Sequence, residues 1–132
     1  METILLVEDD PLTRWVVSRA LLRAGFLVLE ARDATESQVR IEASATPIAL
    51  FVIDALLSGR LGSEVGALLR TKNPQIPILY LSGYDADVLD SSQLEREDCH
   101  VLPHALVGTQ LVSRIRQILA RTAFASLELL RP

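Results

Sequence analysis

The chain has 132 residues, of which 49% are hydrophobic, so it is long enough for one domain with a well-filled core. Its formal net charge of −4 excludes the basic surface that a general nucleic-acid binder needs. No apolar run approaches the length of a membrane span, and Met1-Glu2-Thr3 lacks the basic start of a secretion signal. We therefore expect a soluble cytoplasmic protein with neither nucleic acid nor membrane among its partners. Cys99 is the only cysteine and cannot form an internal disulfide.

Short apolar runs alternate with segments of helical periodicity along the chain. The runs are apolar throughout and rich in β-branched residues, which is typical of strands buried on both faces of a parallel sheet. Asp10-Pro11 and Asp33 are signals for the start of a helix. In chain order, the expected elements are a strand at Thr3–Val7, a helix at Pro11–Ala24, a strand at Phe26–Ala31, a helix from Asp33 to about Ala43, a strand at Ile48–Ile53, a loop to Gly62, a helix at Ser63–Thr71, a strand at Ile78–Leu81, a weak helix near Ala86–Leu94, a strand at Val101–Leu102, and an amphipathic helix carrying Leu111, Ile115, Ile118 and Leu119.

This order predicts an α/β fold of (βα)₅ type, because the crossovers are long enough for neighbouring strands to pair in parallel. Right-handed crossovers would give a doubly wound three-layer sandwich around a five-stranded parallel sheet. We expect one domain over residues 1–121, with residues 122–132 as an extension of the last helix or a tail. Trp15 and Leu22 share a helical spacing that favours core packing.

The tail beyond residue 122 stays apolar, with Phe124 and Leu127 among its large side chains. Three alternatives remain open for it. It packs back on its own domain, it packs on a partner or a second copy, or it begins a connection to a longer natural chain.

Polar side chains gather where the predicted strands end. Glu8–Asp10 follow the first strand, Asp54 follows the third, Ser82-Gly83 the fourth and His104 the fifth. In an open parallel sheet these ends form one edge, where ligands bind. Carboxylates packed together raise each other's pKa unless a cation is present, and oxygen ligands of this kind favour Mg²⁺. The pattern predicts one acidic metal site, with Asp10 serving only as a helix cap.

These motifs resemble the receiver domains of two-component response regulators, the CheY-like family with its flavodoxin-like fold, over about residues 3 to 121. The family opens with a strand that ends in an acidic pair, here Glu8-Asp9. Its third strand ends in the phosphoacceptor Asp, here Asp54, and a Gly follows eight residues later, here Gly62. Its fourth strand ends in Ser or Thr and a small residue, here Ser82-Gly83.

The resemblance implies a role for each matching residue. Asp54 would be the phosphoacceptor and a Mg²⁺ ligand, with Asp9 as a direct ligand and Glu8 acting through a metal-bound water. The backbone carbonyl of Leu56 would complete the protein ligands, and Ser82-Gly83 would bind the phosphoryl group. The implied partners are a sensor histidine kinase or histidine phosphotransfer protein and a downstream protein target. No catalysis is implied beyond the domain's own phosphorylation and dephosphorylation.

The chain departs from the family pattern at three positions. The family's Lys-Pro pair is matched by His104-Ala105, so phosphoryl binding falls to an imidazole that carries only part of a charge at neutral pH. The alternative is that His104 is a polar surface residue with no role. The family's Lys-Pro peptide is usually cis, whereas we expect a trans His104-Ala105 peptide because a cis bond before a residue other than proline is costly. Ser58 stands where the family usually has Pro.

The third departure concerns the aromatic switch residue of the family's fifth strand. The matching position is Val101, which has no ring, and Tyr84 is a candidate stand-in. The alternative for Tyr84 is a loop aromatic that covers the sheet edge.

Two functions therefore remain open. The first is a Mg²⁺-dependent phosphoacceptor, and the second is a phosphorylation-independent pseudo-receiver that acts as an interaction or homodimerisation module.

Overall fold

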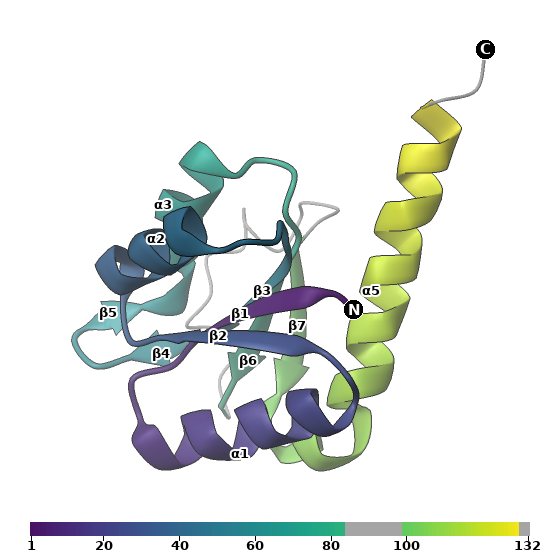
Figure 1. The fold of residues 1–132 in the computed structure, drawn as a ribbon. Coiled ribbons are helices and arrows are strands. Elements are labelled where there is room, and N and C mark those ends of the chain that lie inside the picture. The colour runs from purple at the N-terminus through teal and green to yellow at the C-terminus, as the bar shows by residue number, and fades with distance from the viewer. Residues whose placement is uncertain (84–98, 130–132) are drawn as a thin grey trace.

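A five-stranded parallel sheet forms the centre of the computed structural model, which describes residues 1–83 and 99–129 (Figure 1). The strands lie in the order β2-β1-β3-β6-β7, and each neighbouring pair is parallel. They are β1 (Thr3–Val7), β2 (Leu27–Ala31), β3 (Ile48–Asp54), β6 (Ile78–Ser82) and β7 (Cys99–Pro103). This arrangement confirms the predicted sheet, and β7 is longer at both ends than the strand expected from Val101 and Leu102.

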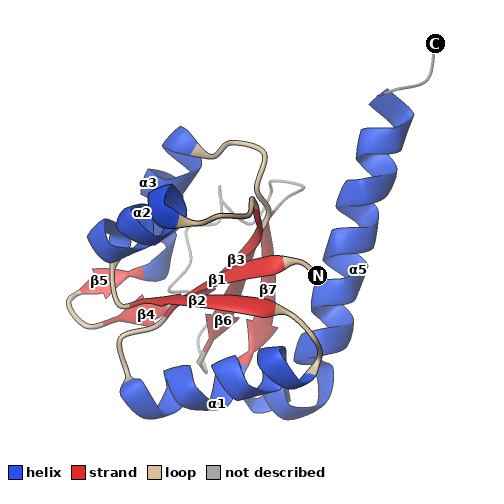
Figure 2. Cartoon of the chain, viewed as in Figure 1, coloured by secondary structure: helices blue, strands red, loops and turns tan. Residues whose placement is uncertain are grey.

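Helices cover both faces of the sheet, as Figure 2 shows. α1 (Pro11–Arg23) and α5 (Val107–Leu129) pack on one face, and α2 (Ala34–Ala43) and α3 (Gly62–Lys72) pack on the other. A short 3₁₀ turn, η2 (His104–Leu106), joins β7 to α5. The helix expected near residues 86–94 lies outside the described residues. None of the described helices combines the length and the apolar character needed to cross a membrane.

The core is divided into two clusters by the sheet. Alternate residues of the central strands point to opposite faces, so that Leu6 and Val52 pack with α1 and α5 while Leu5 and Phe51 pack toward α2 and α3. All five residues of β1 and of β6 are buried. The central strands are therefore apolar along their length and change to polar residues only where they leave the core.

Two aspartates fix the starts of helices, as the sequence predicts. The Asp10 Oδ2 atom accepts a hydrogen bond from the Thr13 amide at 2.8 Å, and Asp33 Oδ1 accepts one from the Glu36 amide at 2.8 Å. These contacts satisfy amide groups that have no partner within the first helical turn. The cap role expected for Asp10 is confirmed.

A small antiparallel hairpin follows β3 where the sequence predicts only a loop. It consists of β4 (Leu56–Leu57) and β5 (Arg60–Leu61), joined by a turn at Ser58-Gly59. Gly59 has a φ of 71°, a left-handed conformation that glycine adopts without strain. Strands of two residues are too short to show a hydrophobic period, which is why the pattern missed them.

The prediction that Trp15 and Leu22 pack in the core is wrong. Their side chains are 58% and 51% exposed, because α1 turns a different face toward the sheet. The guanidinium carbon of Arg19 lies 5.2 Å from the centre of the Trp15 ring, on the outside of the helix. The residues of α1 that are buried are Val17, Ser18 and Leu21.

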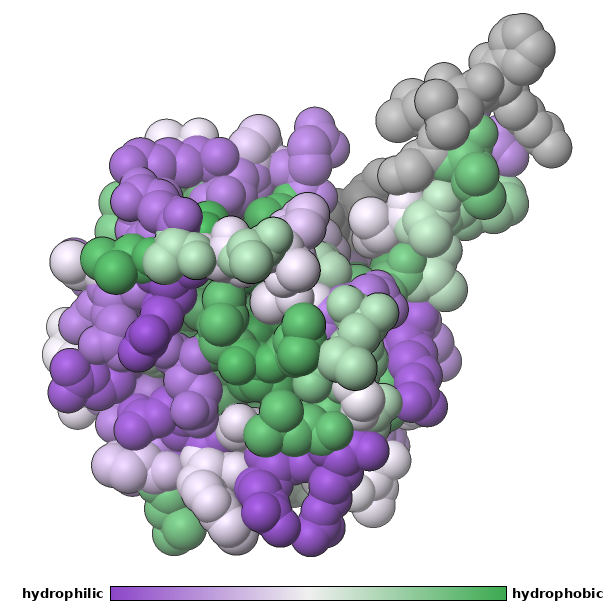
Figure 3. Space-filling model, in the orientation of Figure 1, coloured by the Kyte–Doolittle hydropathy of each residue, from purple (hydrophilic) through white to green (hydrophobic). Residues whose placement is uncertain are grey.

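The last helix continues beyond the sheet, and its end projects from the domain in Figures 1 and 3. Phe124 and Leu127 are 62% and 65% exposed, so these two side chains do not pack back on their own domain. A partner or second copy, and a connection to a longer chain, remain as predictions for this segment.

Gly62→Ala should destabilise the domain by roughly 1–3 kcal/mol or more, because the loop backbone passes too close to admit a side chain. A Cβ at this position would overlap the carbonyl oxygen of Asp54 and lie 2.9 Å from the Ala55 Cα atom, and neither backbone atom can move aside cheaply. Urea and thermal denaturation would measure the change. Gly108→Ala is the control, because nothing lies within 4 Å of its added Cβ and alanine favours the helix. Equal loss in both variants would contradict the close approach.

Candidate functional site

The carboxyl ends of β1 and β3 bring acidic side chains into one cavity of about 680 Å³. Glu8 and Asp9 directly follow β1, and Asp54 is the last residue of β3, which pairs with β1. The cavity walls also include Leu56 and His104. The structure therefore gathers these residues, which come from three separate parts of the chain, around a single space, as the ends of parallel strands predict.

Asp54 is nearly buried, at 8% exposed, and both of its carboxylate oxygens have partners. The Leu56 amide donates a hydrogen bond to Oδ1 at 3.0 Å, and His104 Nε2 lies 3.4 Å from Oδ2. Burial by itself would raise the pKa of Asp54, but its interactions with His104, with Glu8 and with the Leu56 amide outweigh burial and hold that pKa below its ordinary value. Asp54 is consequently ionised at neutral pH.

Glu8 is buried, at 2% exposed, and only one of its oxygens has a donor. Oε1 accepts a hydrogen bond from the Asp10 amide at 3.1 Å, whereas Oε2 has no hydrogen-bond partner among the described residues. Burial, together with the neighbouring Asp54 carboxylate, raises the pKa of Glu8 from 4.5 to about 9. Unless a cation binds beside it, Glu8 holds a proton at neutral pH.

Asp9 accepts a hydrogen bond from the turn of the hairpin that follows β3. The Ser58 amide donates a hydrogen bond to Asp9 Oδ2 at 2.7 Å, although the two residues are 49 positions apart in the chain. This contact could not be predicted from the sequence, because a backbone donor leaves no mark in the residue type. The signal in the sequence was Ser58 at a position where the resemblance leads one to expect proline, which has no N–H.

His104 begins the η2 turn and faces Asp54. The hydrogen bond to Asp54 raises the pKa of the imidazole, and partial burial opposes that shift without reversing it. The described peptide bonds are all trans, which confirms the expectation for His104-Ala105. His104 therefore contacts the acidic cavity and is not an isolated polar group on the surface.

Ser82 and Gly83 lie beside this cavity but are not among its walls. Leu81 pairs with Asp54 across the sheet, so Ser82 stands one residue beyond it along the same edge. Ser82 is buried, and its hydroxyl donates to the Gly83 carbonyl oxygen at 3.3 Å. Tyr84, the candidate stand-in for a switch aromatic, lies outside the described residues.

The donor set of the cavity fits a hard divalent cation. Its ligating atoms are carboxylate oxygens, and the buried Oε2 of Glu8 has no other partner. Within residues 1–83 and 99–129, however, no group of three or more His, Cys, Asp or Glu side chains is already arranged around a metal position. Asp9 and Asp54 each accept a hydrogen bond from a backbone amide on one carboxylate oxygen. The chemistry of these residues nevertheless fits a hard divalent ion.

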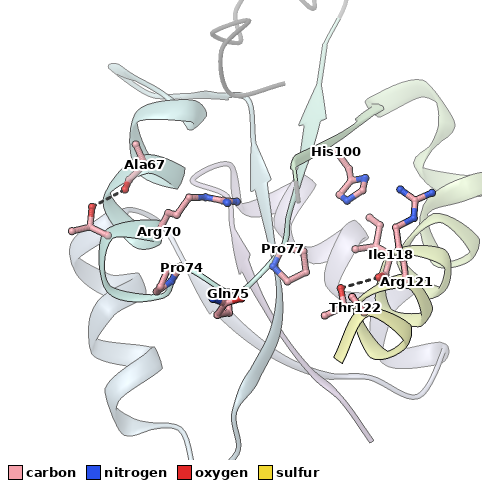
Figure 4. Close-up of a pocket in the computed structure, with 11 residues that line it drawn as sticks. Ala67, Arg70, Pro74, Gln75, Pro77, His100, Ile118, Arg121 and Thr122 are labelled. Carbon is pink, nitrogen blue, oxygen red and sulfur yellow. Dashed lines mark hydrogen bonds between the residues drawn. The ribbon is translucent and has the colours of Figure 1, made fainter. Parts of the chain in front are cut away.

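A larger cavity of about 880 Å³ lies at the other end of the strands (Figure 4). Arg70 of α3, His100 of β7 and Arg121 of α5 line it, together with small, apolar and uncharged polar residues. No carboxylate stands among its described walls. Among the described residues, the acidic groups with shifted pKa values, Glu8, Asp10 and Asp54, all line the cavity at Asp54, so that cavity is the candidate functional site.

Comparison with known sequences points to one family. Residues 4–116 match the sequence model of a family described as the response regulator receiver domain. The response regulator MprA of Mycobacterium ulcerans is 34% identical over 119 residues, which are 90% of this chain and 50% of that protein. The probable transcriptional regulatory protein TcrX of Mycobacterium tuberculosis is 27% identical over 128 residues, covering 96% of this chain and 53% of that protein. The chain thus spans about half the length of these two relatives.

Comparison with solved structures supports the fold. The crystal structure of a response regulator receiver protein from Sinorhizobium medicae WSM419 superposes with a TM-score of 0.76 at 25% identity. The match covers 92% of this chain and 96% of that chain. The predicted CheY-like arrangement of a five-stranded parallel sheet between helices is confirmed.

Once a chelator has removed divalent cations, the wild-type protein should lose stability as the pH rises from about 5 to about 9, and Glu8→Gln should reduce that loss. Between the ordinary pKa of 4.5 and the raised value of about 9, the folded chain keeps a proton that the unfolded chain has released. Folding therefore becomes less favourable with each step in pH, while glutamine is neutral throughout.

Denaturation midpoints measured across this pH range test the effect. The stabilisation by Glu8→Gln should be near zero at about pH 5 and on the order of 1–3 kcal/mol at about pH 8. Glu42→Gln, at an exposed position of α2, is the control and should follow the wild-type curve. Parallel curves for Glu8→Gln and wild type would rule out a proton on Glu8.

Proposed function

The chain belongs to the response regulator receiver domain family, a module of two-component signalling, and on that basis we propose that it accepts a phosphoryl group on Asp54. The donor is a sensor histidine kinase or a histidine phosphotransfer protein. The observation that carries the proposal is the position of Asp54, which is ionised, nearly buried and paired with His104 in a cavity that Glu8 and Asp9 also line.

The proposed transfer requires one bond exchange. An oxygen of the Asp54 carboxylate forms a bond to phosphorus while the bond between phosphorus and the donor's imidazole nitrogen breaks. The electron pair of the broken bond returns to that nitrogen. Asp54 enters this step without losing a proton first, because its pKa is held below the ordinary value.

Mg²⁺ is the proposed cofactor, and it supplies positive charge that offsets repulsion between the carboxylates and the incoming phosphoryl group. Asp9 and Asp54 would hold it directly, with the backbone carbonyl of Leu56, and Glu8 would act through a bound water. The raised pKa of Glu8 supports this assignment, as does its Oε2 atom, which has no hydrogen-bond partner among the described residues, because a bound cation would relieve the crowding of these carboxylates.

His104 and Ser82 are proposed to respond to the modification. In the structure His104 pairs with Asp54, and after phosphorylation its imidazole would pair with the added oxygens instead. Ser82-Gly83 at the end of β6 would donate to the same group. The change in these contacts would then alter the surface of β7 and α5 that a downstream protein or a second copy binds.

Phosphorylation of Asp54 is tested by labelling the protein with acetyl phosphate and locating the added mass. Labelling should require Mg²⁺ and should disappear in Asp54→Ala, because Asp54 is the proposed phosphoacceptor and its carboxylate is ionised and nearly buried in the candidate site. Asp10→Asn is the matched control, since asparagine still caps α1 and the residue lines the same cavity. Absence of labelling at any Mg²⁺ concentration would instead favour the phosphorylation-independent interaction module.

His104→Lys should raise the phosphorylated fraction several-fold at a fixed concentration of acetyl phosphate. A full positive charge makes a charge-assisted hydrogen bond to the phosphoryl group worth about 1.5–3 kcal/mol, and imidazole supplies only part of it. His104→Gln, which has no charge, should lower the fraction below wild type. Gel separation of the phosphorylated form measures all three proteins, and an equal or smaller fraction in the lysine variant would contradict this account of His104.

A further inference from the structure

Two carboxylates that line the candidate site, those of Asp54 and Asp9, accept hydrogen bonds from amides of one short segment. The Leu56 amide donates to Asp54 Oδ1 at 3.0 Å, and the Ser58 amide, two residues later, donates to Asp9 Oδ2 at 2.7 Å. One stretch of backbone therefore bridges the ends of β3 and β1. The shorter of these bonds is the one made by Ser58.

The hairpin leaves the Ser58 amide available for this contact. Ser58 and Gly59 form the two-residue turn between Leu57 and Arg60, which pair with each other. Ser58 is the first central residue of this turn, and Gly59, with its φ of 71°, is the second. In a turn of this kind the closing hydrogen bond joins the residues on either side, so the amide of the first central residue is left for another acceptor. The buried side chain of Leu57 and the close approach of Gly62 to the Asp54 backbone hold the hairpin in place.

We infer that the Ser58 backbone amide is a positioning group, which fixes one oxygen of Asp9 so that the other is presented to the divalent cation. This inference rests on the proposed Mg²⁺-dependent function. The hydrogen bond engages Oδ2 alone, and no hydrogen bond to Oδ1 is found within the described residues. Partners that orient a metal-binding side chain in this way contribute strongly to metal affinity.

This contact depends on the residue type at position 58. Proline, which the receiver resemblance leads one to expect at position 58, has no N–H and cannot make this contact. Serine at this position therefore ties Asp9 to the hairpin that begins at Asp54.

Ser58→Pro tests the inference, because proline suits the first position of such a turn and its neighbour Leu57 is already extended. The substitution removes the amide proton and should weaken Mg²⁺ binding about tenfold. Ser58→Ala keeps the amide and loses only the hydroxyl, so this conservative variant should stay within about twofold of wild type. Titration followed by nuclear magnetic resonance measures the affinity, and circular dichroism checks that each variant is folded.

A second measurement tests the hydrogen bond between the Ser58 amide and Asp9 in the absence of Mg²⁺. Hydrogen exchange at the Ser58 amide should be slow in the wild type and at least about tenfold faster in Asp9→Ala, and Asp10→Asn should leave it unchanged. Equal exchange in wild type and Asp9→Ala would overturn the inference, as would unchanged or tighter Mg²⁺ binding in Ser58→Pro. Mg²⁺ binding that depends on the Ser58 amide but without any labelling of Asp54 would instead uphold the inference and remove the proposed phosphorylation.

Discussion

Crowding of negative charge at the ends of β1 and β3 is the constraint around which the rest of the site is built. Glu8, Asp9 and Asp54 line one cavity, and two of them are almost completely removed from water. Carboxylates in such surroundings must be protonated, paired or hydrogen-bonded. All three solutions occur here, because Glu8 takes up a proton, Asp54 faces His104, and Asp9 accepts a backbone amide.

The backbone after β3 supplies much of that compensation. The segment from Leu56 to Ser58 turns two amides toward two different carboxylates, and the hairpin it begins is secured by the Gly62 amide, which donates to the Ala55 carbonyl oxygen at 2.8 Å. Only glycine fits at position 62, because any side chain would meet the backbone of Asp54. The geometry of the carboxylates and the geometry of the loop are therefore parts of one arrangement.

Two residues that differ from what the receiver resemblance leads one to expect lie in this arrangement. Ser58, where proline is expected, donates its amide to Asp9, and His104, where lysine is expected, places an imidazole beside Asp54. The chain spans about half the length of the relatives MprA and TcrX, so the match concerns the receiver unit shared with them. The exposed Phe124 and Leu127 on the projecting end of α5 lie outside the family match, which ends at residue 116.

The sequence by itself determined the order of the five sheet strands and of the four described helices, the parallel sheet, and the edge at which Asp54 and its acidic neighbours meet. These follow from local rules, since a strand buried on both faces must be apolar until it ends, and Asp10 can cap only the helix beside it. Tertiary structure alone decided the contact between Ser58 and Asp9, the proton on Glu8 and the outward face of Trp15. The physical reason is that backbone donors, burial and the direction of a helix face depend on what lies opposite in space, and a residue type does not record its distant neighbours.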